Sequence, residues 1–399
     1  MMFTARSPSL FENDPRWNAL NLPRRAVGPR TGVLPSQALH ALIDRKEIYA
    51  ADAGTDVGID PGQVQPASLD LRLGPIAYRI RASFLPGKGG TVESKLSAMQ
   101  SHVIDLSKGA VLETECVYLV PLMERLDLRS TLSATANPKS STGRLDVFTR
   151  LIADGTDSFD YVPAGYSGPL YIEISPRSFS ILVRQGSRLN QLRLLRRTTR
   201  QARDKRFLSD AELKALHRQS PLVDSEPTVR DGINLRVDLT PQTRQRLIGY
   251  KAKRYAGVVD VDQVGGYEIR KFWEEIYDDE NGRLILDPHE FYILASKEAV
   301  VVPSQYAAEM APFDPMMGEF RVHYAGFFDP GFGVINGKPK GAKAVLEVRS
   351  LDIPFILEDG QTIGRLLYER LADIPEVLYG QDLGSSYQAQ GLKLSKHFK

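Results

Sequence analysis

The seven residues 138–144, Pro-Lys-Ser-Ser-Thr-Gly-Arg, bring together two cations, three hydroxyl groups and a glycine. They follow the strand-like run 117–120 by about twenty residues, which predicts a turn into a short helix. Backbone N–H groups at a helix start bind anions, and Lys139 and Arg144 add positive charge. Small hydroxyl residues also serve as plain helix caps. The segment therefore indicates either a phosphate-binding site or an ordinary helix start.

A glutamate lies inside an apolar run at two places in the chain. Glu173 belongs to Leu-Tyr-Ile-Glu-Ile (170–174), and Glu347 belongs to Ala-Val-Leu-Glu-Val (344–348). Burying a carboxylate costs free energy unless the group is paired. Burial also raises the pKa of the carboxyl, so that it can act first as a base and then as an acid. Each glutamate is therefore either a catalytic group or half of a buried ion pair.

The offset of 174 residues between these glutamates recurs elsewhere in the chain. Residues 112–119 resemble residues 286–293 at the same offset. A glycine follows each glutamate by thirteen residues and opens another apolar run. Such matches at one offset predict two copies of a single structural unit.

Short runs rich in β-branched and aromatic residues, bounded by Gly and Pro, predict a mainly β fold of two tandem distorted β-barrel or jelly-roll domains. We expect few helices, over 36–45 with Ser36 as its cap and over 209–218 with Ser209 as its cap. The basic run 193–206 is interpreted as a solvated linker or helix face. The expected organisation is an extended arm (1–30), a first repeat (31–200), a basic helical linker (201–225) and a second repeat (226–399).

Composition excludes several classes of protein. The chain has 399 residues, 42% of them hydrophobic, and a net charge of +2, which argues against a dedicated nucleic-acid binder. No apolar run approaches the length of a membrane span, and the N-terminus has no signal-peptide core. The single Cys116 excludes an internal disulfide framework and fits a cytoplasmic location. One cysteine and six scattered histidines cannot form the ligand cluster of a zinc deaminase.

Five segments together resemble the dCTP deaminase branch of the trimeric dUTPase superfamily. Residues 65–74 are similar to its N-terminal strand signature. Residues 139–144 resemble its Arg-Ser-Ser-x-x-Arg phosphate motif, with a lysine in place of the first arginine. Residues 164–173 are similar to the segment that ends at the catalytic glutamate, and 323–333 to the pyrimidine-binding hairpin. The tail 387–391 resembles the glutamine-rich segment that closes over the triphosphate.

Each repeat lacks part of the family pattern. At the position of the phosphate motif, the second repeat reads Phe-Asp-Pro-Met-Met-Gly (313–318). The first repeat has a longer hairpin (152–163) without Asp-Pro-Gly, and it has no glutamine-rich tail. In this superfamily the phosphate motif and the hairpin of one site come from different subunits. We therefore predict one composite site, built from the phosphate motif of the first repeat and the hairpin, glutamate and tail of the second, either within one chain or between chains.

The resemblance implies zinc-independent hydrolytic deamination of dCTP to dUTP and ammonia. Glu347, or Glu173, would activate the water, and Ser140 and Arg144 would orient the water and the base. The residues expected to bind the substrate are Lys139, Ser141, Ala325, Phe328, Asp329, Tyr387 and Gln390. Magnesium would arrive with the triphosphate, bound mainly through phosphate oxygens. A homo-oligomer is expected, either a trimer or a smaller pseudo-symmetric assembly.

Two alternatives stay open on the sequence. The chain could hydrolyse dUTP, alone or after deamination, with Asp329 activating water for attack on phosphorus. The Asp-Pro-Gly context of this residue is also ordinary turn chemistry. The same fold could instead bind dCTP or dUTP without turnover, as a nucleotide sensor.

Overall fold

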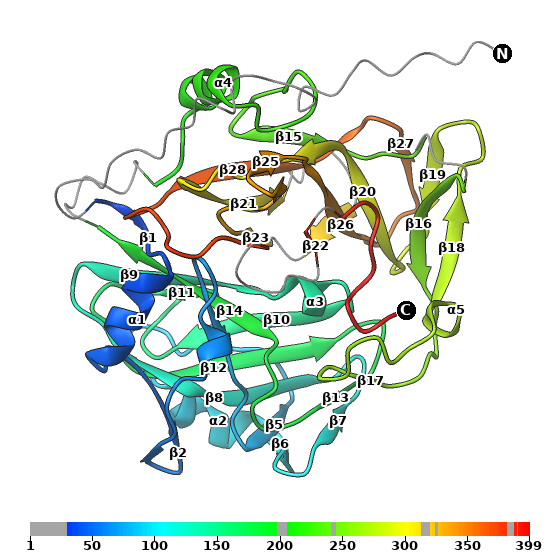
Figure 1. Ribbon diagram of the computed structural model, residues 1–399. Coiled ribbons are helices and arrows are strands. Elements are labelled where there is room, and N and C mark those ends of the chain that lie inside the picture. Colours follow the sequence, from blue (N-terminus) through cyan, green and yellow to red (C-terminus); the bar gives the residue numbers. More distant parts are fainter. Residues whose placement is uncertain are drawn as a thin grey trace.

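The computed structural model describes residues 30–197, 206–240, 245–312, 320–323, 326–380, 387–388 and 390–399, with the backbone alone for 312 and 320–323. Sheets dominate both halves of the chain, and the described helices are short (Figure 1). The prediction of a mainly β fold with few helices is confirmed. The described helices are α1 (Ser36–Asp44), α2 (Val92–Met99), α3 (Ser140–Gly143), α4 (Asp210–Gln219), α5 (Ile269–Phe272) and the 3₁₀ turn η2 (Pro61–Gln63).

Three sheets organise the first half. One contains β1 (Gly32–Val33), β14 (Asn190–Arg196), β9 (Leu132–Pro138), β11 (Tyr161–Val162) and, beside β14, β4 (Leu69–Leu71). The second contains β10 (Val147–Ala153), β12 (Ser167–Pro176), β8 (Val117–Asp127), β2 (Ile48–Asp52), β3 (Thr55–Asp56), β5 (Ile76–Ile80) and β6 (Gln100–Asp105). The third is formed by β7 (Ala110–Leu112), β13 (Ile181–Val183) and β17 (Val259–Asp260).

The second half contains two sheets and two strand pairs. One sheet contains β15 (Ile233–Arg236), β28 (Thr362–Arg370), β21 (Tyr306–Pro312) and β23 (Phe327–Phe328). Another contains β18 (Trp273–Tyr277), β16 (Leu247–Ala252), β20 (Phe291–Val300), β26 (Ala342–Ser350) and β22 (Phe320–His323). Two strand pairs complete it, β19 (Arg283–Leu286) with β27 (Phe355–Glu358) and β24 (Val334–Ile335) with β25 (Lys338–Pro339).

Strand order is shared between the halves. The path β4–β14–β9–β11 of the first half corresponds to β15–β28–β21–β23 of the second, and β10–β12–β8–β5 corresponds to β22–β26–β20–β16. Glu173 lies opposite Leu119 on β8, and Glu347 lies opposite Ile293 on β20, so the two glutamates occupy equivalent positions in their sheets.

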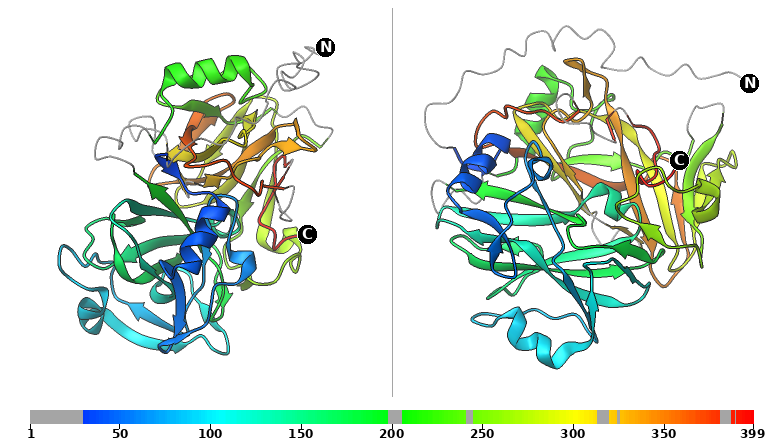
Figure 2. Two further views of the ribbon diagram at one scale, coloured as in Figure 1. Left: turned by 60° about the vertical axis from the view of Figure 1, so that its left-hand side comes forward. Right: turned by 60° about the horizontal axis from the view of Figure 1, so that its bottom comes forward.

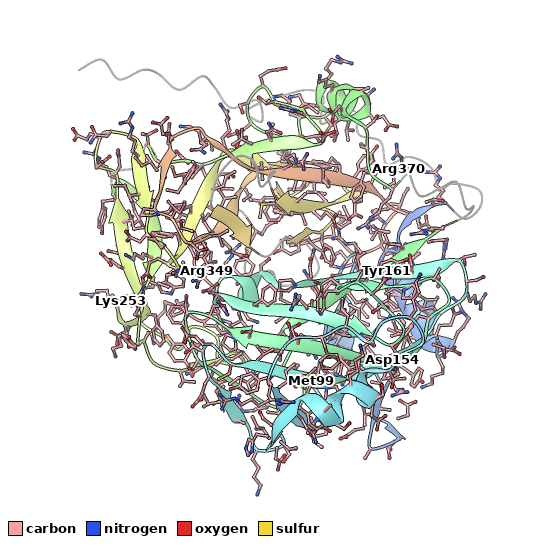
Figure 3. All side chains as sticks on the ribbon, turned by 180° about the vertical axis from the view of Figure 1, so that it is seen from behind. Met99, Asp154, Tyr161, Lys253, Arg349 and Arg370 are labelled. Atoms are coloured by element: carbon pink, nitrogen blue, oxygen red, sulfur yellow. The ribbon has the colours of Figure 1, made fainter. Side chains whose placement is uncertain are left out.

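The two halves of the chain lie against each other (Figure 2). Strand pairing and an aromatic cluster join them. Strand β17 of the second half pairs in parallel with β13 of the first, with Ile181 opposite Val259. Phe179 of the first half packs edge-on against Phe272 and Trp273 of the second, with ring centroids 5.6 and 5.2 Å apart. Arg349, which donates to Asp146 of the first half, lies at the boundary between the halves in Figure 3.

Two local predictions were wrong. Helix α1 begins at Ser36 after Pro35, so Ser36 is its first residue and no side chain caps it. The basic run 193–206 is not a solvated linker throughout, because Arg193 to Arg196 continue strand β14 and the side chain of Arg193 is fully buried. Charge alone suggested solvation, while the carboxylates that meet Arg193 come from the second half. Residues 198–205 of this run lie outside the described residues.

Helix α4 follows the prediction, since Ser209 caps it and forms a reciprocal capping box with Glu212. No helix in the described ranges is long and apolar enough to cross a membrane.

Candidate active site

A cavity of about 460 Å³ lies between the two halves of one chain. The first half contributes the residues around the start of α3, and the second half contributes β23, the centre of β26 and the C-terminal segment. Nine of the predicted site residues line this cavity: Lys139, Ser140, Ser141, Arg144, Phe328, Asp329, Glu347, Tyr387 and Gln390. Segments that are distant in the sequence therefore meet in one place.

The segment 138–144 forms the expected strand, turn and short helix. Pro138 ends β9, Lys139 has extended backbone angles, and α3 follows directly. The ammonium group of Lys139 forms an ion pair with Asp70 of β4. The carbonyl of Ser141 accepts a hydrogen bond of 2.7 Å from Ser395 Oγ, so the C-terminal segment is attached directly to α3.

Arg144 is almost fully buried and is held by the C-terminal segment. Its Nη1 donates to Gln390 Oε1 and to the carbonyl of Lys393, both at 3.0 Å. The guanidinium carbon lies 4.0 Å from the centre of the Tyr387 ring, which gives a cation–π contact. The Nε atom is buried and has no acceptor among the described residues. Gln390 and Tyr387 therefore fix the orientation of this arginine at the cavity.

Glu347 lies at the centre of β26 and has 5% of its surface exposed. Burial raises the pKa of this carboxyl well above its ordinary value, with Arg144 opposing the rise and Asp146 adding to it. The described residues give it no hydrogen bond or ion pair. A buried carboxyl that lines a cavity and has a raised pKa is suited to carrying a proton.

Strand β23 and the turn after it bring a carboxylate and two aromatic rings to the cavity. Asp329 Oδ1 accepts a hydrogen bond of 3.2 Å from Nη2 of Arg193, and burial raises the pKa of this aspartate. Phe328 and Phe332 meet edge-on with centroids 5.0 Å apart. Both rings also belong to the core of the second half, so they combine packing with an apolar surface for a ligand.

Known protein families identify the chain. The model of the 2'-deoxycytidine 5'-triphosphate deaminase N-terminal domain matches residues 30–199, and that of the C-terminal domain matches residues 209–398. A crystal structure of 2'-deoxycytidine 5'-triphosphate deaminase from Agrobacterium tumefaciens is 53% identical, with a TM-score of 0.79, and the match covers 86% of this chain and 99% of that one. The chain belongs to the 2'-deoxycytidine 5'-triphosphate deaminase family. The resemblance seen in the sequence is confirmed.

Two curated relatives match over a shorter region. The "dCTP deaminase, dUMP-forming" of Halobacterium salinarum is 30% identical over 127 residues. The dCTP deaminase of Natronomonas pharaonis is 29% identical over 127 residues. Each match covers 31% of this chain and 60% of the relative, so the chain spans less than two thirds of the length of these relatives.

Glu173, the other glutamate predicted to be catalytic, lies away from the cavity. Glu173 does not line the cavity, and its Oε1 accepts from Nε and Nη2 of Arg150 at 3.0 and 2.5 Å. The guanidinium of Arg150 in turn lies 3.7 Å from the centre of the Phe159 ring. Glu173 is therefore half of a buried ion pair in this structure. Ala325, predicted to bind the base, lies outside the described residues.

Several residues at the cavity were not predicted as site residues. Gln65 is the first residue of the strand signature 65–74, from which no site role was predicted for it. Arg188 lies just after the turn glycine Gly186. Lys396 lies beyond the glutamine-rich tail, in a stretch where the resemblance offers no motif. A basic residue in a turn or near a terminus is usually solvated, so only the fold could bring these side chains to the cavity.

The described part of the chain contains no group of three or more His, Cys, Asp or Glu side chains that could hold a metal ion. At the cavity, Asp70 is paired with Lys139 and Asp262 with Arg184.

Proposed function

We propose that this chain deaminates dCTP by hydrolysis to give dUTP and ammonia, without zinc. The observation that carries the proposal is the meeting of Glu347, a buried carboxyl without a partner among the described residues, with Arg144 and the hydroxyl-rich start of α3 in one cavity. The family to which the chain belongs gives the substrate class. The polar donors of the cavity and its aromatic wall suit a nucleotide.

The carboxylate form of Glu347 takes a proton from a water molecule, and the resulting hydroxide attacks C4 of cytosine. The same proton passes to the ring nitrogen N3, which gives a tetrahedral intermediate. Ammonia leaves as the carbonyl of uracil forms, after a proton from the new hydroxyl group has moved to the amino group. Arg144 and Ser140 orient the water and the base. Because burial raises the pKa of Glu347, the group is better suited to accept a proton and return it than an exposed glutamate is.

The remaining residues bind the substrate. Lys139 and Ser141 hold phosphate oxygens, while backbone groups around Ala325 to Asp329 contact the cytosine edge. Phe328 packs near the sugar, and Tyr387 and Gln390 cover the bound nucleotide. Magnesium is bound mainly through the phosphates of the substrate, as its preference for oxygen and water ligands favours.

A second candidate function is supported by the name of the Halobacterium salinarum relative, which is described as dUMP-forming. A bifunctional enzyme would continue from dUTP to dUMP and diphosphate, with Asp329 at the cavity as the group that activates the second water. The experiment is to incubate purified protein with dCTP and magnesium, with a chelator control, and to measure ammonia and nucleotides by chromatography. Ammonia with accumulating dUTP supports deamination alone, and dUMP with diphosphate supports the bifunctional reaction. Tight binding without turnover would leave the sensor hypothesis.

The Gln390→Ala variant should lower kcat/KM for dCTP about tenfold. It removes one of the two acceptors that hold Nη1 of Arg144, and a charge-assisted hydrogen bond contributes about 1.5–3 kcal/mol. Steady-state kinetics check the loss, and Gln361→Ala, in the turn before β28, is the matched control. An unchanged kcat/KM with Gln390→Ala would mean that the C-terminal segment does not position Arg144.

The assembly and the location of the protein also belong to this proposal. We expect a homo-oligomer in the cytoplasm, either a trimer or a pseudo-symmetric assembly. Light scattering coupled to size-exclusion chromatography measures the number of chains directly.

A further inference from the structure

An ion pair between the two halves of the chain lies beside Arg144 and Glu347. Asp146 of the first half accepts a hydrogen bond from Nη2 of Arg349, which belongs to β26 of the second half. The side chains of Asp146 and Arg349 are 1% and 13% exposed. Asp146 follows Arg144 by two residues, and Arg349 follows Glu347 by two residues. The pair therefore joins the segment that carries Arg144 to the strand that carries Glu347 (Figure 3).

The position of Asp146 is fixed by the turn that follows α3. Its N–H donates to the carbonyl of Gly143 at 2.9 Å, and its carbonyl accepts from the N–H of Arg177 at 2.9 Å. Its φ angle of 56° lies in the left-handed region, which aspartate adopts more readily than most residues with a side chain. Ser178 Oγ donates at 2.6 Å to the same carboxylate oxygen that Arg349 contacts. The fold of the first half therefore sets the place of this carboxylate.

Arg349 is held by the second half. Its Nη1 donates to the carbonyl of His289, and its guanidinium carbon lies 5.9 Å from the centre of the Phe291 ring. Residues two apart in a strand point to the same face, so Arg349 and Glu347 share one face of β26. Because the strand is continuous between them, the ion pair attaches this part of β26 to the turn after α3.

Neither Asp146 nor Arg349 is among the described residues that line the cavity. An effect of the pair on the reaction would therefore pass through Arg144 and Glu347. Burial raises the pKa of Glu347, the charge of Arg144 lowers it, and the charge of Asp146 raises it. In the register of the sheet, His323 on β22 lies opposite Glu347 on one side and Ile293 on β20 lies opposite it on the other.

We propose that Asp146 and Arg349 are positioning residues, which hold Glu347 in place against Arg144 across the two halves of the chain. This inference rests on the proposed function for the roles of Glu347 and Arg144. A shift of about 1 Å in the place of a reacting group can lower a rate about a hundredfold. The charge of Asp146 acts in the same direction, because a carboxylate whose pKa is raised is a stronger base toward water.

The test begins with steady-state kinetics of dCTP deamination by the full-length chain. Arg349→Met should lower kcat about tenfold to a hundredfold. KM should stay within about threefold of the parent value, because the substituted side chain does not line the cavity. Arg349→Lys keeps a cation beside Asp146 without the planar fork of donors, so it should recover part of the lost kcat.

The control variant is Gln37→Met, which breaks a different contact between the halves. Gln37 of α1 donates to the carbonyl of Ile374 at 2.6 Å, and neither residue lines the cavity. The kcat of this variant should stay within about twofold of the parent value. Thermal melting of each variant checks that the fold is retained.

Asp146→Asn provides a measurement that a purely structural role would not change. The value of kcat/KM should rise with pH as Glu347 loses its proton. The midpoint of this rise should move to lower pH in Asp146→Asn, because the charge that raises the pKa of Glu347 is absent. The same effect can be followed without turnover. The gain in melting temperature that Glu347→Gln gives between pH 5 and pH 8 should be smaller in the Asp146→Asn background than in the parent.

Two results would overturn the inference while leaving the proposed function in place. One is a loss of kcat with Arg349→Met that is no larger than the loss with Gln37→Met. The other is a pH midpoint and a gain in melting temperature that both stay unchanged in Asp146→Asn. If the parent chain does not deaminate dCTP, the proposed function fails. A smaller gain in melting temperature in the Asp146→Asn background would then still support the action of Asp146 on Glu347.

Discussion

The Glu347→Gln variant should lose about a thousandfold in kcat for dCTP deamination, the middle of the range for removal of a general acid–base group. Glutamine preserves the shape of the side chain but cannot take a proton from water or return one to the base. Glu347 also lacks any hydrogen bond or ion pair within the described structure, so the substitution breaks no contact seen there. The measurement is ammonia release under saturating dCTP.

The same variant should be more stable than the parent at high pH. The folded-state pKa of Glu347 is raised above its ordinary value of 4.5. The stabilising contribution of the neutral Glu347 carboxyl is therefore fully present below pH 4.5, and it is lost as pH rises through the folded-state pKa. Glutamine stays neutral throughout. The melting temperature of Glu347→Gln should thus rise relative to that of the parent between pH 5 and pH 8. If the difference in melting temperature were the same at both pH values, the raised pKa of Glu347 would be contradicted.

Glu173→Gln is the matched control, because it changes the equivalent glutamate of the first half. Turnover should be largely retained, since this residue does not line the cavity. Stability should fall by about 1.5–3 kcal/mol, because Arg150 loses the charged acceptor of two hydrogen bonds. A loss of turnover equal to that of Glu347→Gln would contradict the model of one composite site built with Glu347.

The comparison of these two glutamates shows what the sequence could and could not predict. Both lie in similar apolar runs, and their equivalent places in the two sheets follow from the 174-residue offset. The surroundings of Glu173 depend on the neighbouring strand, because Arg150 lies opposite it on β10 and forms the ion pair. Register between strands is set by packing of whole sheets, so the sequence left the choice between the two open.

Only some of the residues at the cavity could be predicted from the sequence. The motif 138–144 was found from its residue types, whereas the hairpin and the tail were found from their resemblance to family segments. Arg188 and Lys396 reach the cavity only through tertiary packing, and Arg193 was interpreted as solvated although it is fully buried. The partners of Arg193 come from the second half, more than a hundred residues later in the chain. Long-range pairs of this kind leave no local pattern in one sequence.

The Arg193→Met variant should lower the free energy of unfolding by about 3–5 kcal/mol, the cost of removing one partner from a buried ionic group. Arg193 donates to Asp329 at 3.2 Å and to the carbonyl of Ala308 at 3.1 Å, and it forms an ion pair with Glu369. Its guanidinium carbon also lies 3.9 Å from the centre of the Phe327 ring. Its loss would leave Asp329 buried without its cationic partner and would free the hairpin, so KM for dCTP should rise.

The pH dependence of Arg193→Met identifies the cause. Burial and the neighbouring Glu369 raise the pKa of Glu309 to about 7, and burial raises that of Asp329. Both pKa values are held down by Arg193, so the variant should raise them further. When the pKa of a carboxyl is raised in the folded state, stability is lost as pH rises. The free energy of unfolding of Arg193→Met should therefore fall further below that of the parent at pH 8 than at pH 5.5. Urea denaturation at both pH values measures it.

Two further variants separate charge from geometry. Arg193→Lys keeps the charge but not the planar fork, so it should recover only part of the stability. Arg246→Met is the control, because Arg246 is 43% exposed and pairs with Asp278 and Glu280 at the surface, where an ion pair contributes less than about 1 kcal/mol. If Arg193→Met lowered the free energy of unfolding by no more than Arg246→Met does, the buried ionic group would not hold the hairpin. A large and pH-dependent difference between them would mean that a strand of the first half positions the hairpin of the second half that is proposed to bind the base.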